Sequence, residues 1–435
     1  GLIRAANHLA LDLKVPIIVG PVDQGNLLQV LTQVALPNGV MIIAPTSTLS
    51  SLSSLGPNPA APTPLVWRAS FADSSFSSTA ADLITADTQN RITLAVGEKL
   101  RILEVVEGDI FGSLIGTQLQ QKLCYNKDGS GACIPASSQT TSPCNVLGGC
   151  GFFNANFGNP RDPVGDPAPA AVVAKNVLPE AFALRPHIIA TGATLVAIPN
   201  VLSPLEAQWD AATGAQNTTD GITTGLPLNA SPRPIWVAAN PSWQSDLLGA
   251  AIAADTSIAH GQIPLIHRVF IIRGAVTIGP TADQWISRFN GAAFNSDLSP
   301  QLTGATINPL LFNVFDSAYL AEYALAALGS QPLTGVNSAN AMASLLASGG
   351  TEVTDDPSTI GTTFGTLASG GAITLNGLAG DMAFDPKTGA PPGDGQAACV
   401  GKQGTALTFP FSGFFWNHKN DQGSGAVDPV KCPTN

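Results

Sequence analysis

Short apolar segments alternate with amphipathic ones along most of the chain, and this alternation is the feature that most constrains the fold. The segment VPIIV (15–19) stops at Gly20-Pro21, and VMIIA (40–44) stops at Pro45. Segments 2–13 and 24–36 carry apolar residues at helical spacing. Strands that are apolar throughout are typical of parallel sheets whose two faces are both covered by helices. The sequence therefore predicts an α/β protein.

The same pattern recurs downstream. We expect further strands at 102–106, 187–190, 235–239, 269–272 and 373–375, and helices at 111–123, 205–212, 243–254, 312–328 and 339–347. Two segments lack this rhythm: a cysteine-rich excursion at 124–179 and a Gly-rich tail from 390 to 435. With 435 residues, and about 150 residues for an ordinary domain, the chain is long enough for two or three domains.

Composition and charge exclude several classes of partner. Hydrophobic residues make up 44% of the chain and charged residues only 11%, which indicates a folded protein with ample apolar surface to bury. The formal net charge is −11, and the 19 Lys and Arg residues are not clustered. We therefore expect no binding to nucleic acid or to anionic membrane surfaces. No uncharged apolar run reaches the roughly 18 residues of a membrane-spanning helix.

The cysteines indicate an oxidising compartment. The chain has six of them: Cys124, Cys133, Cys144, Cys150, Cys399 and Cys432. They form no C-x-x-C motif, no histidine lies near them at zinc-ligand spacing, and they fall in turn-rich segments. An even number of cysteines in such loops favours disulfides over the alternative of buried free thiols. The pairing stays open, because six cysteines allow 15 connectivities.

Motifs of enzymes are missing from the sequence. It has no G-x-S-x-G, no H-E-x-x-H and no G-x-G-x-x-G after a strand. His260 and His267 are the one pair of neighbouring histidines, and the Asp355-Asp356 pair lies in a turn-like sequence. We therefore predict no catalytic residue, no metal ligand and no cofactor.

Small polar residues follow several of the expected strands. They occur at 20–24, 45–48 and 191–194, and each group precedes an expected helix. In open α/β sheets, ligands bind beyond the carboxyl ends of the strands. Hydroxyl groups and helix N-terminal amides suit a carboxylate or a similar polar ligand. The alternative for each group is ordinary N-capping by Ser and Thr.

Six segments resemble the motifs of one protein family, in the family's order. They are VPIIVGPVDQG (15–25), VMIIAPTSTLSSL (40–52), LVWRASFAD (65–73), GDIFG (108–112), FDSAYLAEYAL (315–325) and ITLNGLAGDMAFDPKTG (373–389). Together they resemble the periplasmic solute-binding proteins of branched-chain amino acid ABC transporters, which are Leu/Ile/Val-binding-like. The resemblance implies a type I periplasmic-binding fold, in which two Rossmann-like lobes with parallel sheets are joined by a three-crossover hinge. It also implies a binding protein, not an enzyme.

The resemblance further implies where the lobes lie. Lobe one would comprise 1–75 plus 275–374, and lobe two 76–274 plus 375–435, with the cysteine-rich excursion inside lobe two. The family begins with a strand, a helix and a strand before the part that matches Leu2 onward. The sequence shows no match to this unit, so we expect that the chain is clipped, that a segment is omitted, or that lobe one is rebuilt.

The family's motifs also imply a ligand site between the lobes. Its expected residues are Asp23, Gln24, Ser47, Thr48, Asp73, Phe111, Thr191, Gly192 and Asn240. Phe111 stands where the family has a tyrosine, and Asn240 where an acidic residue usually holds the ammonium group of the ligand. An unpaired ammonium in a closed cleft costs several kcal/mol. We therefore expect a ligand with fewer charges, or with a larger or more apolar body, than leucine.

The resemblance leads to one expected function and leaves two alternatives. We expect a periplasmic or extracellular receptor that passes a small polar organic ligand, amino-acid-like or less charged, to the membrane permease of an ABC transporter. A lipid anchor before processing is an open point. One alternative is a sensory or scaffold protein that binds a protein partner through the excursion. The other is a hydrolase whose site has no recognised motif.

Overall fold

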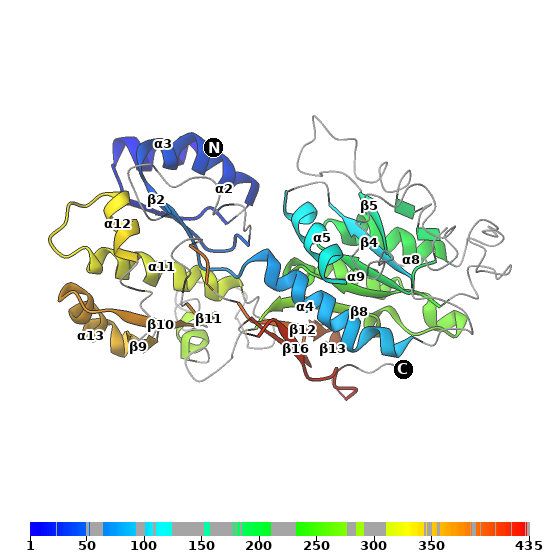
Figure 1. The fold of residues 1–435 in the computed structure, drawn as a ribbon. Helices are drawn as coiled ribbons and strands as arrows, with labels where there is room; N and C mark the ends of the chain where they lie inside the picture. The colour runs from blue at the N-terminus through cyan, green and yellow to red at the C-terminus, as the bar shows by residue number, and fades with distance from the viewer. Residues whose placement is uncertain are drawn as a thin grey trace, which may run out of the picture. The chain divides into compact units, whose positions relative to one another are not determined.

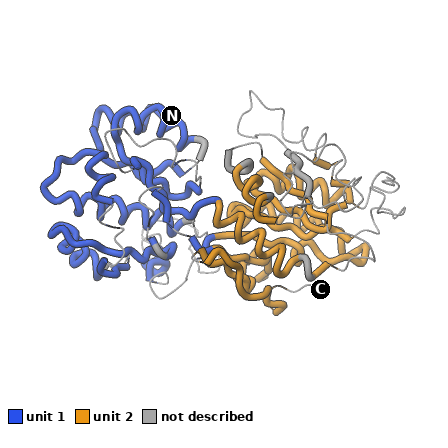
Figure 2. The backbone as a smooth tube through the Cα atoms, in the orientation of Figure 1, with its two compact units in different colours: residues 1–73, 274–394 blue, residues 74–273, 395–435 orange. Residues whose placement is uncertain are grey.

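The computed structural model describes most of the chain. The described residues are 1–22, 24–48, 52, 64–92, 101–107, 110–123, 152–156, 177–178, 181–182, 185–209, 232–275, 284–290, 310–342, 345, 350–354, 357–382, 384, 389–391, 393–404, 406–418, 420–430 and 432. They divide into two compact units (Figure 2): residues 1–73 with 274–394, and residues 74–273 with 395–435. The chain therefore passes three times from one unit to the other. Residues 375–394, which the family resemblance places in lobe two, lie in the first unit.

A parallel three-stranded sheet opens the first unit. Its strands β1 (Ile17–Val19), β2 (Met41–Ala44) and β3 (Val66–Arg68) lie side by side in that order. The first two confirm the strands that the apolar runs predict. Helices α1 (Leu2–Asn7), α2 (Gln24–Val30) and α3 (Leu36–Asn38) flank them along the chain, extended by π-helical segments at His8–Asp12 and Leu31–Ala35. Every residue of β2 is buried, as a central parallel strand requires.

The first unit also contains a second sheet. Strand β10 (Ile373–Gly377) pairs in parallel with β9 (Thr351–Thr354) and antiparallel with β11 (Gly380–Asp381). Three helices accompany it: α11 (Leu310–Ala327), α12 (Gly335–Met342) and α13 (Pro357–Ala368). The core forms around α11 and includes Trp67 of the first sheet and Leu375 of the second. One hydrophobic core therefore joins both sheets of this unit.

Asp316 fixes the position of α11 in this unit. The side chain is fully buried, and its two carboxylate oxygens accept hydrogen bonds from the backbone N–H groups of Leu378 (2.9 Å) and Ala379 (2.8 Å). A Cβ at Gly377 would lie 2.6 Å from Asp316 Oδ2, so the turn can approach the carboxylate this closely only with glycine. Asp316 of α11 therefore holds the turn between β10 and β11 in place.

The second unit is built on one eight-stranded sheet (Figure 1), in the order β16-β15-β12-β8-β7-β6-β4-β5. Five of its strands are parallel neighbours: β5 (Phe152–Asn156), β4 (Ile102–Val106), β6 (Ile188–Thr191), β7 (Ile235–Ala238) and β8 (Val269–Gly274). The antiparallel strands are β12 (Gly395–Cys399), β15 (Phe411–Asn417) and β16 (Gln422–Ser424). A separate hairpin joins β13 (Gly401–Gln403) to β14 (Ala406–Thr408). The Gly-rich tail thus becomes part of the sheet.

Helices cover both faces of the parallel part of this sheet. Helices α8 (Ser203–Trp209) and α9 (Asp246–Ala253) pack on the face that carries Leu103 and Trp236. Helix α5 (Ile110–Leu123) packs on the other face, where a Cβ at Gly116 would lie 3.0 Å from Val106 Cγ2. Helix α4 (Asp73–Ala86) begins where the chain enters this unit. Coverage of both faces confirms the α/β architecture that the continuous apolar strands predict.

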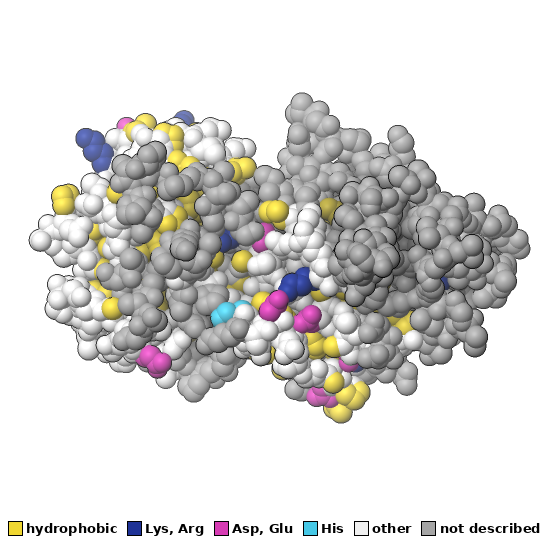
Figure 3. Space-filling model, viewed as in Figure 1, with side chains coloured by type: hydrophobic (Ala, Val, Ile, Leu, Met, Phe, Trp, Pro, Cys, Tyr) yellow, Lys and Arg dark blue, Asp and Glu magenta, His cyan; other side chains and the backbone are white. Residues whose placement is uncertain are grey.

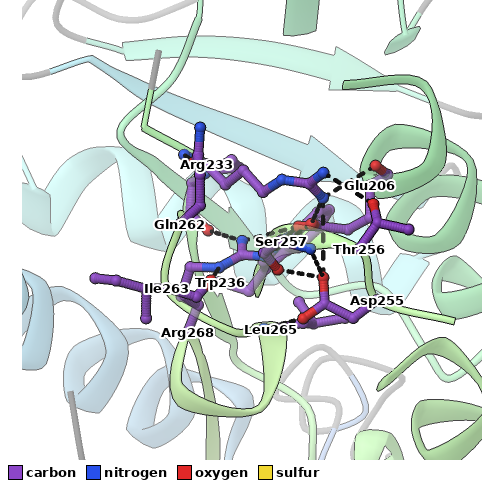
Figure 4. Close-up of polar contacts among 11 residues, drawn as sticks. Glu206, Arg233, Trp236, Asp255, Thr256, Ser257, Gln262, Ile263, Leu265 and Arg268 are labelled. Atoms are coloured by element: carbon purple, nitrogen blue, oxygen red, sulfur yellow. Dashed lines mark hydrogen bonds and ion pairs between the residues drawn. The ribbon is translucent and has the colours of Figure 1, made fainter. Parts of the chain in front are cut away.

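A buried polar network lies inside the second unit (Figure 4). Glu206 of α8 accepts hydrogen bonds from Arg233 Nη1 (2.7 Å to Oε2), Arg268 Nη2 (2.7 Å to Oε2) and Arg268 Nη1 (2.9 Å to Oε1). Trp236 Nε1 donates to Glu206 Oε1 at 3.1 Å. Asp255 Oδ1 lies 3.9 Å from Arg233 Nη1. Two cations and two carboxylates therefore neutralise one another away from water.

One disulfide is described. Cys399 of β12 is bonded to Cys432, 33 residues further along the chain, which confirms that these two candidates form a disulfide. Cys124, Cys133, Cys144 and Cys150 lie outside the described residues. In the part of the chain that the structure describes, no helix combines the length and the apolar character needed to cross a membrane.

Candidate functional site

The first unit gathers polar residues at the carboxyl ends of β2 and β3. Ser47 and Thr48 follow β2 and are 1% and 3% exposed, and Arg68 ends β3. The carbonyl oxygen of Thr48 accepts hydrogen bonds from the backbone N–H of Asp73 (2.8 Å) and from Arg68 Nη1 (3.3 Å). The structure thus brings together three residues that the sequence predicts for the site, namely Ser47, Thr48 and Asp73.

Two serine hydroxyls at this edge lack a hydrogen-bond partner within the described residues. They are the buried Oγ atoms of Ser47 and Ser70. Burial lowers the pKa of Arg68 to about 10, although the charge of Asp73 counteracts this effect. Arg68 therefore stays charged at neutral pH. Buried hydroxyls without partners cost free energy, and a bound oxygen-rich group would remove that cost.

In the second unit, the loops after β4 and β6 are joined by Glu107. Its Oε2 accepts hydrogen bonds from Thr194 N (2.7 Å) and from Thr194 Oγ1 (2.8 Å). Thr191 Oγ1 donates to the carbonyl oxygen of Val105 (2.8 Å) and accepts from Ala193 N (3.0 Å). Thr191 is completely buried, so its hydroxyl holds the loop in place.

Asn240 joins the loops after β6 and β7 in the same way. Its Nδ2 donates to the carbonyl oxygen of Gly192 (3.3 Å), and its Oδ1 accepts from Ser242 N (3.0 Å). Ser242 Oγ in turn accepts from Leu195 N (2.9 Å). A Cβ at Gly192 would lie 2.5 Å from Ile115 Cγ2, so only glycine fits there. The structure therefore brings Thr191, Gly192 and Asn240 together, with polar groups that cross-link the loops.

Three of the expected site residues cannot be compared with the structure in full. Asp23 lies outside the described residues. Gln24 begins α2 and Phe111 lies in the first turn of α5, but their side chains are outside the described part. Their contribution to a ligand site stays a prediction.

Sequence reasoning missed two charged residues at the edge of the second unit, Glu107 and Arg273. Arg273 ends the apolar run VFIIR of β8 and is partly buried. Burial lowers the pKa of Arg273 to about 10. The signal that could have found it is its place: a cation directly after four apolar residues, at the carboxyl end of a predicted strand.

Comparisons with known proteins identify the fold. No protein-family model matches the chain, and no curated protein matches it. Among solved structures, the chain resembles the solute-binding protein of an R. palustris ABC transporter in complex with 4-hydroxybenzoate, with a TM-score of 0.57 and 12% identity over 97% of this chain and 83% of that one. It also resembles a solute-binding protein from Rhodopseudomonas palustris in complex with 3,4-dihydroxybenzoic acid, with a TM-score of 0.53 and 13% identity over 98% of this chain and 83% of that one.

A third structure agrees with these two. It is a periplasmic binding protein from Burkholderia mallei, with a TM-score of 0.52 and 11% identity over 100% of this chain and 84% of that one. The sequence identities are low, so the likeness concerns the fold. The fold predicted from the sequence is confirmed: the chain has the two-lobed α/β fold of the type I periplasmic solute-binding proteins.

Proposed function

We propose that the chain is an extracytoplasmic receptor that binds a small organic molecule and delivers it to the membrane permease of an ABC transporter. The observation that carries this proposal is the agreement between fold and site. The similar structures are solute-binding proteins, and polar groups gather at the carboxyl ends of the parallel strands in each unit. In α/β sheets this edge is where ligands bind.

The described residues offer polar groups that suit a small organic ligand. Ser47 and Ser70 offer hydroxyl groups, and Arg68 places a positive charge beside Thr48. Within the described ranges, no group of three or more His, Cys, Asp or Glu side chains is arranged to hold a metal ion. On the face shown in Figure 3, the described Lys and Arg side chains are few and form no continuous basic patch. These features favour a small ligand over a nucleic acid.

The ligand is expected to carry fewer charges than an amino acid. Asn240 stands where the family motif has an acid, and its amide is already hydrogen-bonded to Gly192 and Ser242. At this position an ammonium group would meet an amide in place of the family's carboxylate. The similar structures contain 4-hydroxybenzoate and 3,4-dihydroxybenzoic acid, so aromatic acids are the first ligands to test.

The proposed location is periplasmic or extracellular. The disulfide between Cys399 and Cys432 supports it, because such bonds persist in oxidising compartments. A ligand that binds the closed form of such a receptor more tightly would shift an open–closed equilibrium by the free energy of the contacts made only in that form. The permease would then recognise the closed form.

A thermal-shift screen with a matched pair of variants tests this proposal. We expect one class of small organic acid to raise the unfolding temperature of the wild-type protein, as any ligand specific for the folded state does. Ser47→Ala removes a buried hydroxyl and should weaken binding of that ligand about 3- to 10-fold. Ser330→Ala, an exposed serine of the same unit, is the control and should change nothing. A broad metabolite panel that shifts no transition would contradict the receptor and favour the scaffold alternative.

A further inference from the structure

Arginines in the second unit differ sharply in how their charge is neutralised. Arg233 and Arg268 are buried and share the carboxylate of Glu206 (Figure 4). Arg101 donates from Nε to the carbonyl oxygen of Arg185 at 2.9 Å. Arg273 differs from Arg233 and Arg268 because its guanidinium forms no ion pair within the described residues, and burial is the cause of its lowered pKa. Its buried Nε has no hydrogen-bond partner there, as is also true of the Nε of Arg233.

The strand register places Arg273 at the ligand-binding edge of the sheet. The last paired residues of β7 and β8 are Ala238 and Ile271. Asn240 keeps an extended backbone (φ −151°, ψ 118°), so continuing the register by two residues aligns it with Arg273. Because side chains alternate along a strand, Arg273 lies on the same face of the sheet as Ile271. Ile271 belongs to the hydrophobic core on that face, and Arg273 follows it two residues later, at the end of the strand.

One carboxylate at this edge, that of Glu107, already has hydrogen-bond partners in the loop after β6. Glu107 follows β4 and accepts two hydrogen bonds from Thr194. Strands β6 and β7 lie between β4 and β8, so at about 4.8 Å per strand their backbones are roughly 14 Å apart. Glu107 therefore does not neutralise Arg273. Asn240, which the strand register aligns with Arg273, is uncharged and does not neutralise Arg273 either.

We propose that Arg273 is a specificity-determining residue that holds the carboxylate of an organic monoanion lacking an ammonium group. The proposal rests on the receptor function proposed above and names its ligand class. An arginine guanidinium can donate two parallel hydrogen bonds to one carboxylate, which gives both affinity and orientation. The partly buried cation lacks a counter-ion among the described residues, so an anion is favoured over a zwitterion or a neutral molecule.

The test compares acids with their own amides. Benzoate, 4-hydroxybenzoate and 3,4-dihydroxybenzoate, and the corresponding primary amides, are titrated into wild type and Arg273→Gln by calorimetry at pH 7. We expect wild type to prefer the acid by tenfold or more. Arg273→Gln should lose roughly 10- to 100-fold in affinity for the acid and keep its affinity for the amide. Lys402→Gln removes an exposed cation of the same unit and should leave both affinities unchanged.

A second readout needs no ligand. Arg273→Gln removes a partly buried cation that lacks a partner within the described residues, so it should leave the unfolding temperature unchanged or raise it. Arg268→Gln breaks an ion pair and should lower it. A fall of equal size in both variants would show that Arg273 is structural and overturn the inference.

The binding outcomes also separate the two proposals. Equal affinity for acid and amide, or an unchanged affinity for the acid in Arg273→Gln, would overturn the role of Arg273 and leave the receptor intact. Failure of wild type to bind any member of the broader metabolite panel would contradict the receptor itself.

Discussion

Replacement of Glu206 by glutamine provides a strong test of the packing of the second unit. Glu206 receives three hydrogen bonds of 2.7–2.9 Å from the guanidinium groups of Arg233 and Arg268, all of them buried. The glutamine side chain would keep the length of the glutamate but would lose its charge and bring N–H donors against N–H donors. Asp255, with Oδ1 3.9 Å from Arg233 Nη1, would be left to face two cations.

The magnitude follows from the burial of the network. Removal of one partner of a buried ion pair costs roughly 3–5 kcal/mol, because the remaining charge is left uncompensated. For a unit of this size, the unfolding temperature should fall by roughly 6–20 °C. Differential scanning calorimetry measures the transition directly. Glu322→Gln, at an exposed position of α11, is the matched control and should unfold as wild type does.

The pH dependence of the Glu206→Gln effect provides an independent check. Burial alone would raise the pKa of Glu206, but the charges and hydrogen bonds of Arg268 and Arg233 outweigh burial and lower it below its ordinary value. A lowered pKa contributes stability that is complete above the unfolded value of 4.5 and is lost as the pH falls through the folded value. The gap between wild type and Glu206→Gln should therefore narrow in acid. An exposed ion pair contributes at most about 1 kcal/mol to stability. If Glu206→Gln lowers the free energy of unfolding by less than this at pH 7, the reasoning is refuted.

Three further changes test other parts of the structure. A Cβ at Gly274 would lie 2.0 Å from Phe71 Cε2, so Gly274→Ala should lower the free energy of unfolding by about 1–3 kcal/mol, measured in urea. Phe71→Leu should restore part of this loss. An unchanged free energy of unfolding in Gly274→Ala would contradict the packing. The disulfide between Cys399 and Cys432 joins residues 33 positions apart, so the variant with serine at both positions should lose about 3–4 kcal/mol of unfolding free energy in urea. An unchanged urea midpoint of unfolding would contradict this. Burial raises the pKa of Asp82, because it disfavours the charged form of the carboxyl group in the folded state. Asp82→Asn should therefore unfold at a higher urea concentration than wild type at pH 7, and this gain in stability should shrink as the pH falls. A lower stability of the variant at pH 7 would contradict this reasoning.

Local sequence patterns predicted many strands and helices of the fold, but they did not predict β3, α4, β9 or α13. The runs at 15–19, 40–44 and 235–239 contain strands β1, β2 and β7 within one or two residues of the expected bounds. Continuous apolar strands are recognisable because both faces of each strand are buried. The tail was harder: β12 and β15 pair with each other across a hairpin and extend the sheet through β8. Such pairing depends on distant partners, which a local pattern does not show.

The polar interior could not be predicted in the same way. Glu206, Arg233 and Arg268 lie on separate elements and meet only because β7 and β8 are neighbours in the sheet. The motif order did predict that Thr191, Gly192 and Asn240 belong to one edge. It did not reveal that Thr191 and Asn240 use their polar groups to cross-link loops. Arg273 was missed because its sequence neighbours indicate an ordinary core strand.

Small-angle scattering of the wild-type protein, with and without a bound aromatic acid, tests the central claim most directly. A receptor that closes on its ligand predicts a smaller radius of gyration when 4-hydroxybenzoate or a related acid saturates the site, and no change with the matching amide at the same concentration. Saturable binding of the acid with an unchanged radius of gyration would contradict the closing mechanism. A protein that binds no small molecule in this experiment or in the metabolite screen would contradict the receptor as a whole.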